Sequence, residues 1–183
     1  MNSVKQEIAK VYTRYPLSSI LIYNGTTIFH YLLGGIGLIL GYQFIKIGYP
    51  VGFLYVAFAF IQMYVIMPLV VCPNCVYFQI NNSRCISGLN VLSRKIAKKG
   101  NLEDFPNRAK GIFSHNKLYM GSLIAPILAM IPALILNFSF VLLAIFLAVV
   151  GLMVYRIFVV FPKIACIHCS AKKQCPNAQS MGI

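Results

Sequence analysis

The stretch VGFLYVAFAFIQMYVIMPLVVCPNC, residues 51–75, joins a long apolar run to a Cys-x-x-Cys pair. A helix needs about 20 mostly apolar residues to cross the hydrocarbon layer of a membrane. The run before Cys72 reaches that length without a charged residue, so it predicts a transmembrane helix over 49–71. The two cysteines then lie where this helix leaves the membrane.

The whole chain shares this apolar character. Hydrophobic residues make up 59% of its 183 residues and charged residues only 10%, against about 45–50% and about 25% in soluble domains. A water-soluble domain of this size cannot bury so much apolar surface, so we expect a bilayer as the solvent. Three further stretches qualify as spans: 20–43, 118–136 and 138–161, the last two joined by a turn at Asn137. The sequence therefore predicts an all-α, polytopic membrane protein with four transmembrane helices.

Basic residues outnumber acidic ones by sixteen to three, which gives a net charge of +13. Such an excess can indicate nucleic-acid binding, but no helix-turn-helix, C2H2 finger or aromatic-basic RNA motif is present, so we expect no nucleic-acid partner. In a membrane protein, Lys and Arg concentrate in cytoplasmic loops and attract anionic lipids. Only Lys46 lies apart from the N-terminal segment, the central loop and the residues from Arg156 onward. We therefore expect a multi-pass protein of the cell membrane with its N- and C-termini cytoplasmic.

A second stretch, FPKIACIHC at 161–169, repeats the pattern of MPLVVCPNC at 67–75. In each stretch a proline precedes a Cys-x-x-Cys pair by four residues, at the end of the second of two expected spans. A third cysteine follows each pair, Cys85 in the loop and Cys175 in the tail. Helix pairs that start and finish on the same side form parallel repeats about an axis along the membrane normal. We therefore expect two parallel two-helix repeats with their cysteine pairs facing each other.

These features divide the chain into five segments. They are an amphipathic, interfacial N-terminal segment (1–16), a first two-helix membrane repeat (17–71), a basic, Cys-containing cytoplasmic loop (72–117), a second two-helix membrane repeat (118–162) and a Cys-rich cytoplasmic tail (163–183). In the first segment, apolar residues at helical spacing predict a helix along the headgroups: Val4, Ile8, Val11 and Tyr15. The loop repeats this design with Leu89, Leu92 and Ile96.

Six cysteines are the main candidates for chemistry. All of them lie on the side that we assign to the cytoplasm, where thiols stay reduced, so disulfides are disfavoured. Two Cys-x-x-Cys turns allow thiolates to converge on one ion or cluster, and Arg84, Lys172 and Lys173 would help to offset the thiolate charge. The expected metal ligands are Cys72, Cys75, Cys85, Cys166, Cys169 and Cys175.

The identity of the metal depends on weaker signals. The dipeptide Cys175-Pro176 is typical of the end of an iron-sulfur ligand run, which favours an iron-sulfur cluster with zinc as the alternative. Six thiolates fit one four-cysteine site or two three-cysteine sites, each with one further ligand. His115 and His168 are candidates for that ligand, with structural roles as the alternative. His30 is a separate cofactor candidate because it lies within a span, where it would bind a quinone or haem, or else form an interhelical hydrogen bond.

The sequence thus predicts an integral membrane subunit that carries a cysteine-ligated metal centre at the cytoplasmic surface. It would transfer electrons between a soluble partner and a quinone or another subunit of a redox complex. A structural zinc-binding scaffold or assembly subunit is the first alternative, and a membrane thiol-disulfide oxidoreductase is the second. The spans hold no acidic residue, which argues against an ion pump, and no nucleophile–base arrangement indicates a hydrolase. Membrane lipids and other subunits are the expected partners of this non-catalytic or electron-transfer subunit.

Overall fold

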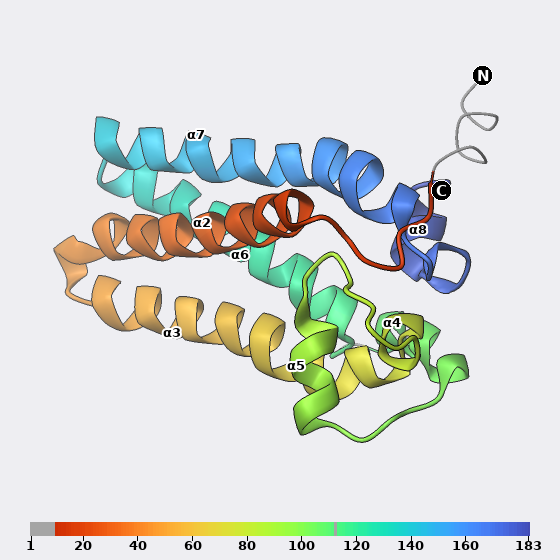
Figure 1. Ribbon diagram of the computed structural model, residues 1–183. Coiled ribbons are helices and arrows are strands. Elements are labelled where there is room, and N and C mark those ends of the chain that lie inside the picture. Colours follow the sequence, from red (N-terminus) through yellow and green to blue (C-terminus); the bar gives the residue numbers. More distant parts are fainter. Residues whose placement is uncertain (1–9, 112) are drawn as a thin grey trace.

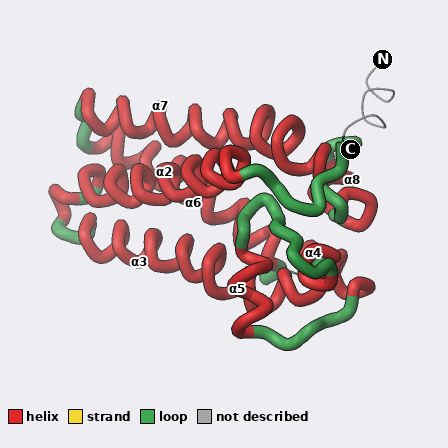
Figure 2. The backbone as a smooth tube through the Cα atoms, in the orientation of Figure 1, coloured by secondary structure: helices red, strands yellow, loops and turns green. Residues whose placement is uncertain are grey.

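A computed structural model describes residues 10–111 and 113–183 (Figure 1). Within these residues all regular structure is helical and no strand occurs, so the all-α prediction is confirmed. Four long helices run lengthwise through the molecule: α2 (Leu17–Gly41), α3 (Gly48–Ile61), α6 (His115–Leu136) and α7 (Phe140–Tyr155). The loops and short helices gather mostly at one end of this bundle (Figure 2).

Three helices of the described chain are long and apolar enough to cross a membrane. They are Gly48–Asn74, His115–Leu136 and Phe140–His168. The first two include the expected spans 49–71 and 118–136, and the third covers 140–161 of the expected span 138–161. The turn expected at Asn137 is confirmed, because Asn137 ends α6 and α7 begins at Phe140. The remaining expected span, 20–43, is occupied by the 25-residue helix α2, which is not among the three; it carries the polar residues Asn24, Thr26, Thr27 and His30.

Side chains on the bundle reverse the pattern of a soluble protein. Large apolar side chains are exposed on the outer faces of the helices, among them Phe53, Leu128, Ile135 and Phe140. Polar side chains are buried between the helices with no exposed surface, among them His30, Gln62, Ser122 and Arg156. A soluble helix turns its apolar stripe inward and its polar face to water. The observed arrangement suits a bundle whose outer surface contacts hydrocarbon.

Helix α2 packs against α3, α6 and α7. Its glycines allow the neighbouring helices to approach closely. A Cβ atom added at Gly34 would lie 2.9 Å from Cβ of Pro126, and one added at Gly41 would lie 2.7 Å from Cβ of Ala133. Small residues at such contacts are the common way to pack helices in a membrane, where apolar side chains gain little by associating.

The helices that carry the cysteine pairs end in the same way. Helix α3 continues into a π-helical segment, η2 (Gln62–Val71), and a 3-10 turn, η3 (Cys72–Asn74). Helix α7 continues into a π-helical segment, η5 (Arg156–Ala165), and a 3-10 turn, η6 (Cys166–His168). The two segments therefore have equal lengths and the same order of helix types, with Gln62 and Arg156 at equivalent positions.

A proline explains the widened turns. Pro68 and Pro162 lie inside the two π-helical segments, and a proline has no N–H group to donate to an α-helical carbonyl. In a π-turn the N–H group donates to the carbonyl five residues earlier. Accordingly, N–H of Cys72 donates to the carbonyl of Met67, and N–H of Cys166 donates to the carbonyl of Phe161. Each Cys-x-x-Cys pair thus starts from the same local geometry.

The routes to the third cysteines differ. After the first pair the chain forms α4 (Val76–Gln79), and Cys85 lies in the loop before α5 (Leu89–Ile96); η4 (Leu102–Ala109) then leads to α6. After the second pair it forms η7 (Lys172–Gln174), and Cys175 lies directly before α8 (Pro176–Ser180). The similarity of the two halves is thus clearest from the π-helical segments to the cysteine pairs.

The N-terminal segment differs from its expected form. Residues 10–16 are not helical, although the spacing of apolar residues predicts a helix there, and Val4 and Ile8 lie outside the described residues. Tyr15 is only 2% exposed. Isolated bridges join Tyr12 to Cys169 and Arg14 to Arg84. Hydrogen bonds to distant backbone groups replace the helical ones, so this stretch forms a strap, residues 10–16, across the end of the bundle.

Candidate functional site

All six cysteines line one pocket of about 100 Å³. The residues that line it come from the end of the bundle where α4, α5 and α8 lie, opposite the α2–α3 and α6–α7 connections (Figure 1). The loop and the tail supply three cysteines each: Cys72, Cys75 and Cys85 from the first half, and Cys166, Cys169 and Cys175 from the second. The structure therefore brings together every cysteine that the sequence suggests as a ligand.

The two Cys-x-x-Cys pairs have matching backbone geometry. The N–H group of Cys75 donates to the carbonyl of Cys72 at 3.0 Å, and that of Cys169 donates to the carbonyl of Cys166 at 3.1 Å. These are the i to i−3 bonds of a tight turn. Each turn brings its two cysteines to the wall of the same pocket.

The third cysteine of each half is held by its own surroundings. The N–H group of Cys85 donates to Oδ1 of Asn90 at 3.0 Å, and Sγ of Cys85 lies 3.3 Å from Oγ of Ser87. The N–H group of Cys175 donates to the carbonyl of Lys172 at 3.3 Å, and the residue is only 9% exposed. Both cysteines thus have a defined backbone position beside their pair.

The polar face of α5 fixes the first cysteine loop in place. Nδ2 of Asn90 donates to the carbonyls of Tyr77 and Ser83, both at 3.1 Å. Arg94 donates to the carbonyls of Phe78 at 3.1 Å and Tyr77 at 2.5 Å. Leu89 packs inward, while Leu92 and Ile96 are exposed. The predicted helix is present, and it uses its polar face to hold the loop and leaves apolar side chains on its outer face.

The six cysteines of the site are free, and burial raises the pKa of Cys75 and Cys169 among them. No disulfide joins the six cysteines. Burial raises the pKa of the Cys75 thiol to about 12, with smaller contributions from the sulfurs of Cys169 and Cys85. Burial also raises the pKa of the Cys169 thiol to about 11, with smaller contributions from Cys175 and Cys85. These mutual effects show that sulfurs from both halves are close, and any metal that binds must displace their protons.

The donor set suits a soft or borderline metal, but the spacing is open. Thiolates are the ligands preferred by zinc and by iron-sulfur clusters. In the described ranges no three Cys, His, Asp or Glu side chains are grouped tightly enough to hold a single ion. The sulfurs therefore surround a common space and do not converge on one point.

One arginine lines the cysteine pocket. Arg108, from η4, takes part in the wall, and its Nε donates to Oδ1 of Asn116 at 2.7 Å. Its guanidinium also lies 5.3 Å from the centre of the Phe105 ring. The sequence pointed to Arg84, Lys172 and Lys173 as the nearby cations, but none of them lines this pocket.

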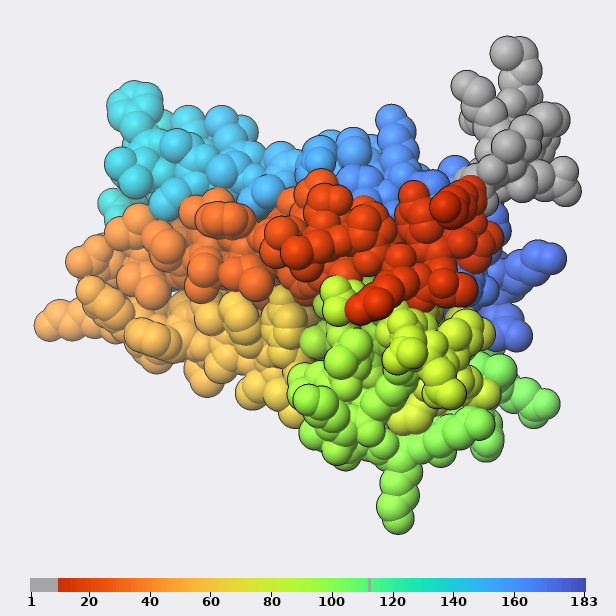
Figure 3. All heavy atoms as spheres, in the orientation of Figure 1, coloured from red at the N-terminus to blue at the C-terminus, as the bar shows by residue number. Residues whose placement is uncertain are grey.

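The strap ties the two cysteine loops together. The N–H group of Tyr12 donates to the carbonyl of His168 at 2.9 Å, and the N–H group of Tyr15 donates to the carbonyl of Arg84 at 2.9 Å. The hydroxyl of Tyr15 donates to the carbonyl of Ala165. Figure 3 shows the red residues of the strap against both the green loop and the blue tail. A structural element that sequence periodicity did not predict thus joins the two cysteine loops, although none of its residues lines the pocket.

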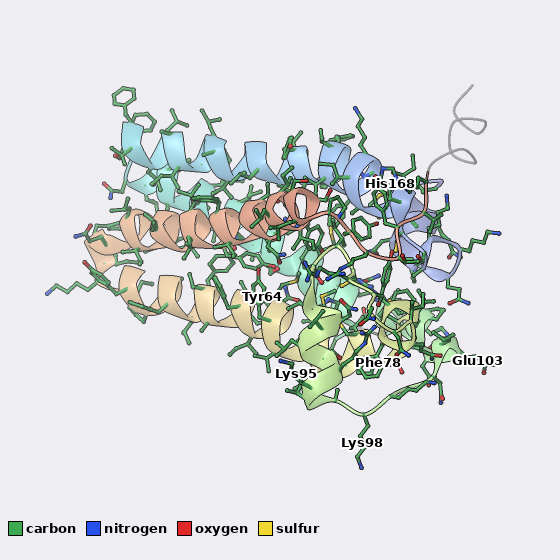
Figure 4. All side chains as sticks on the ribbon, viewed as in Figure 1. Tyr64, Phe78, Lys95, Lys98, Glu103 and His168 are labelled. Atoms are coloured by element: carbon green, nitrogen blue, oxygen red, sulfur yellow. The ribbon has the colours of Figure 1, made fainter. Side chains whose placement is uncertain are left out.

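The two histidines near the cysteines lie outside the pocket wall. The ring of His168 stacks on Tyr12 with centroids 4.6 Å apart, and its Nδ1 lies 2.8 Å from the carbonyl of Lys10 (Figure 4). His115 lines a separate pocket of about 280 Å³ beside Ser114 and Arg108. Structural roles therefore account for the position of His168, while His115 faces a neighbouring space.

His30 lies deep within the bundle and away from the cysteine pocket. It has no exposed surface, and its Nε2 lies 3.0 Å from the carbonyl of Leu123 in α6. This contact is an interhelical hydrogen bond, the alternative role considered for His30. Its Nδ1 has no partner within the described residues.

A buried polar cluster is the second feature that sequence reasoning missed. Arg156 is fully buried and donates to the hydroxyls of Thr26 at 2.8 Å, Thr27 at 2.5 Å and Tyr119. The sequence placed Arg156 near a cytoplasmic helix end, where such side chains usually extend to the interface. The hydroxyl residues Thr26 and Thr27 in the first span were the only hint of an inward-facing cation.

Comparisons with protein-family models, with curated proteins and with solved structures found no match to this chain.

Proposed function

We propose that this protein is an integral membrane subunit that holds a cysteine-ligated metal centre, with an iron-sulfur cluster favoured over zinc, and passes electrons within a redox complex. The observation that carries the proposal is the convergence of six cysteines, from two distant stretches, on one pocket. Metal binding would give these six residues a common role, whereas a free cysteine acts in packing only as a small hydrophobe.

The membrane part of the proposal has four crossings. Helix α2 would be the fourth, because its 25 residues are long enough and its polar side chains face inward, including Thr27 and His30. Both cysteine loops would then lie on the side that carries nearly all Lys and Arg, which the positive-inside rule assigns to the cytoplasm. The two halves would be parallel repeats, as the matching η2 and η5 segments suggest.

The favoured occupant is a polynuclear group because all six cysteines line one shared space. Four thiolates bound to one zinc at about 2.3 Å lie about 3.8 Å from one another. A cluster binds its cysteines through several irons and so accepts a wider spacing. When bound, it would supply one-electron redox chemistry at the membrane surface.

A structural zinc site is the second candidate. The observation in its favour is that the central loop and the tail both line the pocket, and that backbone bonds from Tyr12 and Tyr15 to His168 and Arg84 already tie them together. A metal there would clamp the loop to the tail. Thiol-disulfide exchange is less favoured, because reactive cysteines need a lowered pKa, whereas burial raises the pKa of Cys75 to about 12 and that of Cys169 to about 11.

The metal content of protein purified without oxygen tests the proposal. We expect iron and acid-labile sulfide in stoichiometric amounts, a brown colour, and a broad visible absorbance that bleaches on reduction. Stoichiometric zinc in a colourless protein would replace the redox role by the structural one. Protein that is folded but holds neither metal would refute both.

The orientation is tested with new cysteines at exposed lysines. Lys46 lies in the α2–α3 connection, and Lys98 lies in the loop at the opposite end, where its side chain points outward (Figure 4). We expect a membrane-impermeant thiol reagent added outside intact cells to modify Lys46→Cys but not Lys98→Cys. The reverse labelling would invert the topology, and labelling of both would show that the loop is not sequestered.

A further inference from the structure

Arg156 is a charged side chain that is wholly buried within an apolar bundle. It begins η5, directly after α7. Removal of a charged group from water is costly unless an opposite charge compensates it, and charges within membrane segments usually mark functional sites. The question is therefore which group provides the opposite charge.

The protein satisfies most of the donors of Arg156 with neutral oxygens. Nη1 donates to the carbonyl of Tyr23 at 2.9 Å and to the hydroxyls of Thr26 and Thr27, and Nη2 donates to the hydroxyl of Tyr119. Nε has no partner within the described residues. These contacts solvate the guanidinium, but they do not neutralise its charge.

Aromatic rings complete the surroundings. The guanidinium carbon lies 5.0 Å from the ring centre of Tyr23, 5.8 Å from that of Tyr119 and 5.4 Å from that of Phe161. Ring faces attract a cation, although again without cancelling it. The cation is thus enclosed by hydroxyls, a carbonyl and rings.

No carboxylate of the described residues provides the opposite charge for Arg156. Glu103 and Asp104 are both exposed, in η4 of the central loop, and the full sequence contains only three acidic residues. A buried cation with so few acids in its chain points to an anion that comes from elsewhere.

The cysteine pocket is the adjacent place for such an anion. Tyr23 and Phe161, whose rings face Arg156, also line this pocket. Arg108 also lines the pocket, whereas Arg156 contacts two residues of its wall. Four thiolates around one zinc carry a net charge of about −2, and four thiolates on an iron-sulfur core are likewise anionic.

We infer that Arg156 is the buried counter-charge of an anionic metal–thiolate group held in the cysteine pocket. This inference rests on the proposed metal centre and adds to it the sign of the bound group and the residue that balances it. Arg156 does not line the pocket itself. It contacts the rings of Tyr23 and Phe161, which do line it, and is therefore a positioning residue.

A stability cycle tests the inference. Arg156→Met is measured by thermal unfolding in the metal-loaded and in the metal-stripped protein. We expect the substitution to lower the midpoint of the loaded protein, because the anion loses its partner, and to raise that of the stripped protein, because an unpaired buried cation is removed. Gln62→Leu is the matched control: Gln62 occupies the equivalent position in η2, is also fully buried and is neutral. It should shift both midpoints equally.

A second measurement tests the inference even if Arg156→Met folds poorly. Arg156→Gln keeps polar contacts and Arg156→Lys keeps the charge. Against a competing chelator we expect Arg156→Gln to hold the metal about tenfold more weakly than the wild type, equivalent to about 1.4 kcal/mol, and Arg156→Lys to hold it nearly as well. In an iron-sulfur protein, Arg156→Gln should also shift the midpoint potential to more negative values.

The outcomes separate the inference from the proposed function. A wild-type protein without metal overturns both. A metal-bearing wild type overturns only the role of Arg156 if Arg156→Met shifts the loaded and stripped proteins equally, or if Arg156→Gln retains metal and potential unchanged.

Discussion

Two segments of the molecule, 62–75 and 156–169, follow the same path through a π-helix and a 3-10 turn to a cysteine pair, yet they carry different side chains at equivalent positions. Gln62 donates to the hydroxyls of Tyr31 and Ser122 at 3.0 and 3.3 Å, whereas Arg156 presents a full charge. The difference teaches that backbone geometry presents the cysteines in both halves, while only the second half adds a buried cation.

The two segments are also anchored by different elements. Oγ of Ser93, in α5, donates to the carbonyl of Pro68 at 2.6 Å, so the central loop holds the first segment. The hydroxyl of Tyr15, in the strap, donates to the carbonyl of Ala165, so the N-terminal residues hold the second. The local geometry is alike, but each half depends on a different part of the chain.

The largest expected effect concerns the cysteines that begin the two turns. Cys72→Ser and Cys166→Ser should each reduce the metal bound per chain by at least about tenfold, because even outer-shell partners of a metal are worth about 10–100-fold in affinity. Metal analysis of purified protein measures this. Ile86→Val, which trims an apolar pocket residue and removes neither a thiol nor a hydrogen-bond partner of one, should retain the metal. Loss in only one of the two cysteine variants would mean that the halves do not share one site.

The second effect is on thiol reactivity. In metal-stripped protein, the pKa of Cys75 is raised to about 12 and that of Cys169 to about 11, mainly by burial. At pH 8 their alkylation should be slower than that of an ordinary thiol, with a pKa of about 8.5, by two orders of magnitude or more. Denatured protein, alkylated under the same conditions, is the control. Rapid modification of either cysteine at pH 8 would contradict the burial of that half.

The same shifts determine how stability depends on pH. Because the folded-state pKa values of these two thiols lie above the unfolded value, their contribution is fully present below about pH 8.5. It is lost as pH rises through about 11 for Cys169 and about 12 for Cys75. The thermal midpoint of stripped protein should therefore fall on the alkaline side. A midpoint that rises over this range would contradict the assignment.

The smallest expected effect is on the free energy of unfolding, and it compares Ser93 with Tyr15, which anchor the two segments. Ser93→Ala leaves a buried carbonyl of the first segment without its donor and should lower the free energy of unfolding by about 1–3 kcal/mol. Tyr15→Phe likewise leaves the buried carbonyl of Ala165 without its donor and should lower the free energy of unfolding by about 1–3 kcal/mol. Denaturant titration in detergent measures both, with Ser180→Ala, at an exposed position, as the control. Equal and negligible changes would show that neither anchor carries its segment.

Features that depend on nearby residues could be predicted from the sequence. The apolar runs, the turn at Asn137 and the helix at Leu89–Ile96 follow from composition and spacing within short windows. The repeated proline and cysteine pattern likewise predicted that Cys72 and Cys166 would begin equivalent turns. Local chemistry decides each of these.

Features that depend on distant residues could not be predicted from the sequence. The apolar spacing in the N-terminal segment is as compatible with a helix as with a strap, and the choice is made by Arg84 and His168, which bond to it. A basic residue near a span end can extend to the interface or turn inward. The side chain of Arg156 turns inward because it donates to the hydroxyls of Thr27 and Tyr119, which lie on two other helices.

The strap also has a consequence for the order of assembly. The contact between Tyr15 and Ala165 spans 150 residues, and a contact between residues so far apart in sequence forms late and slowly. Because synthesis proceeds from the N-terminus, the strap can pair with Arg84 early, whereas its contact with Ala165 must wait until the second cysteine loop has been made. The strap can therefore tie the two cysteine loops together only after residues 165–169 have been made, so we expect this connection to form at a late stage of folding.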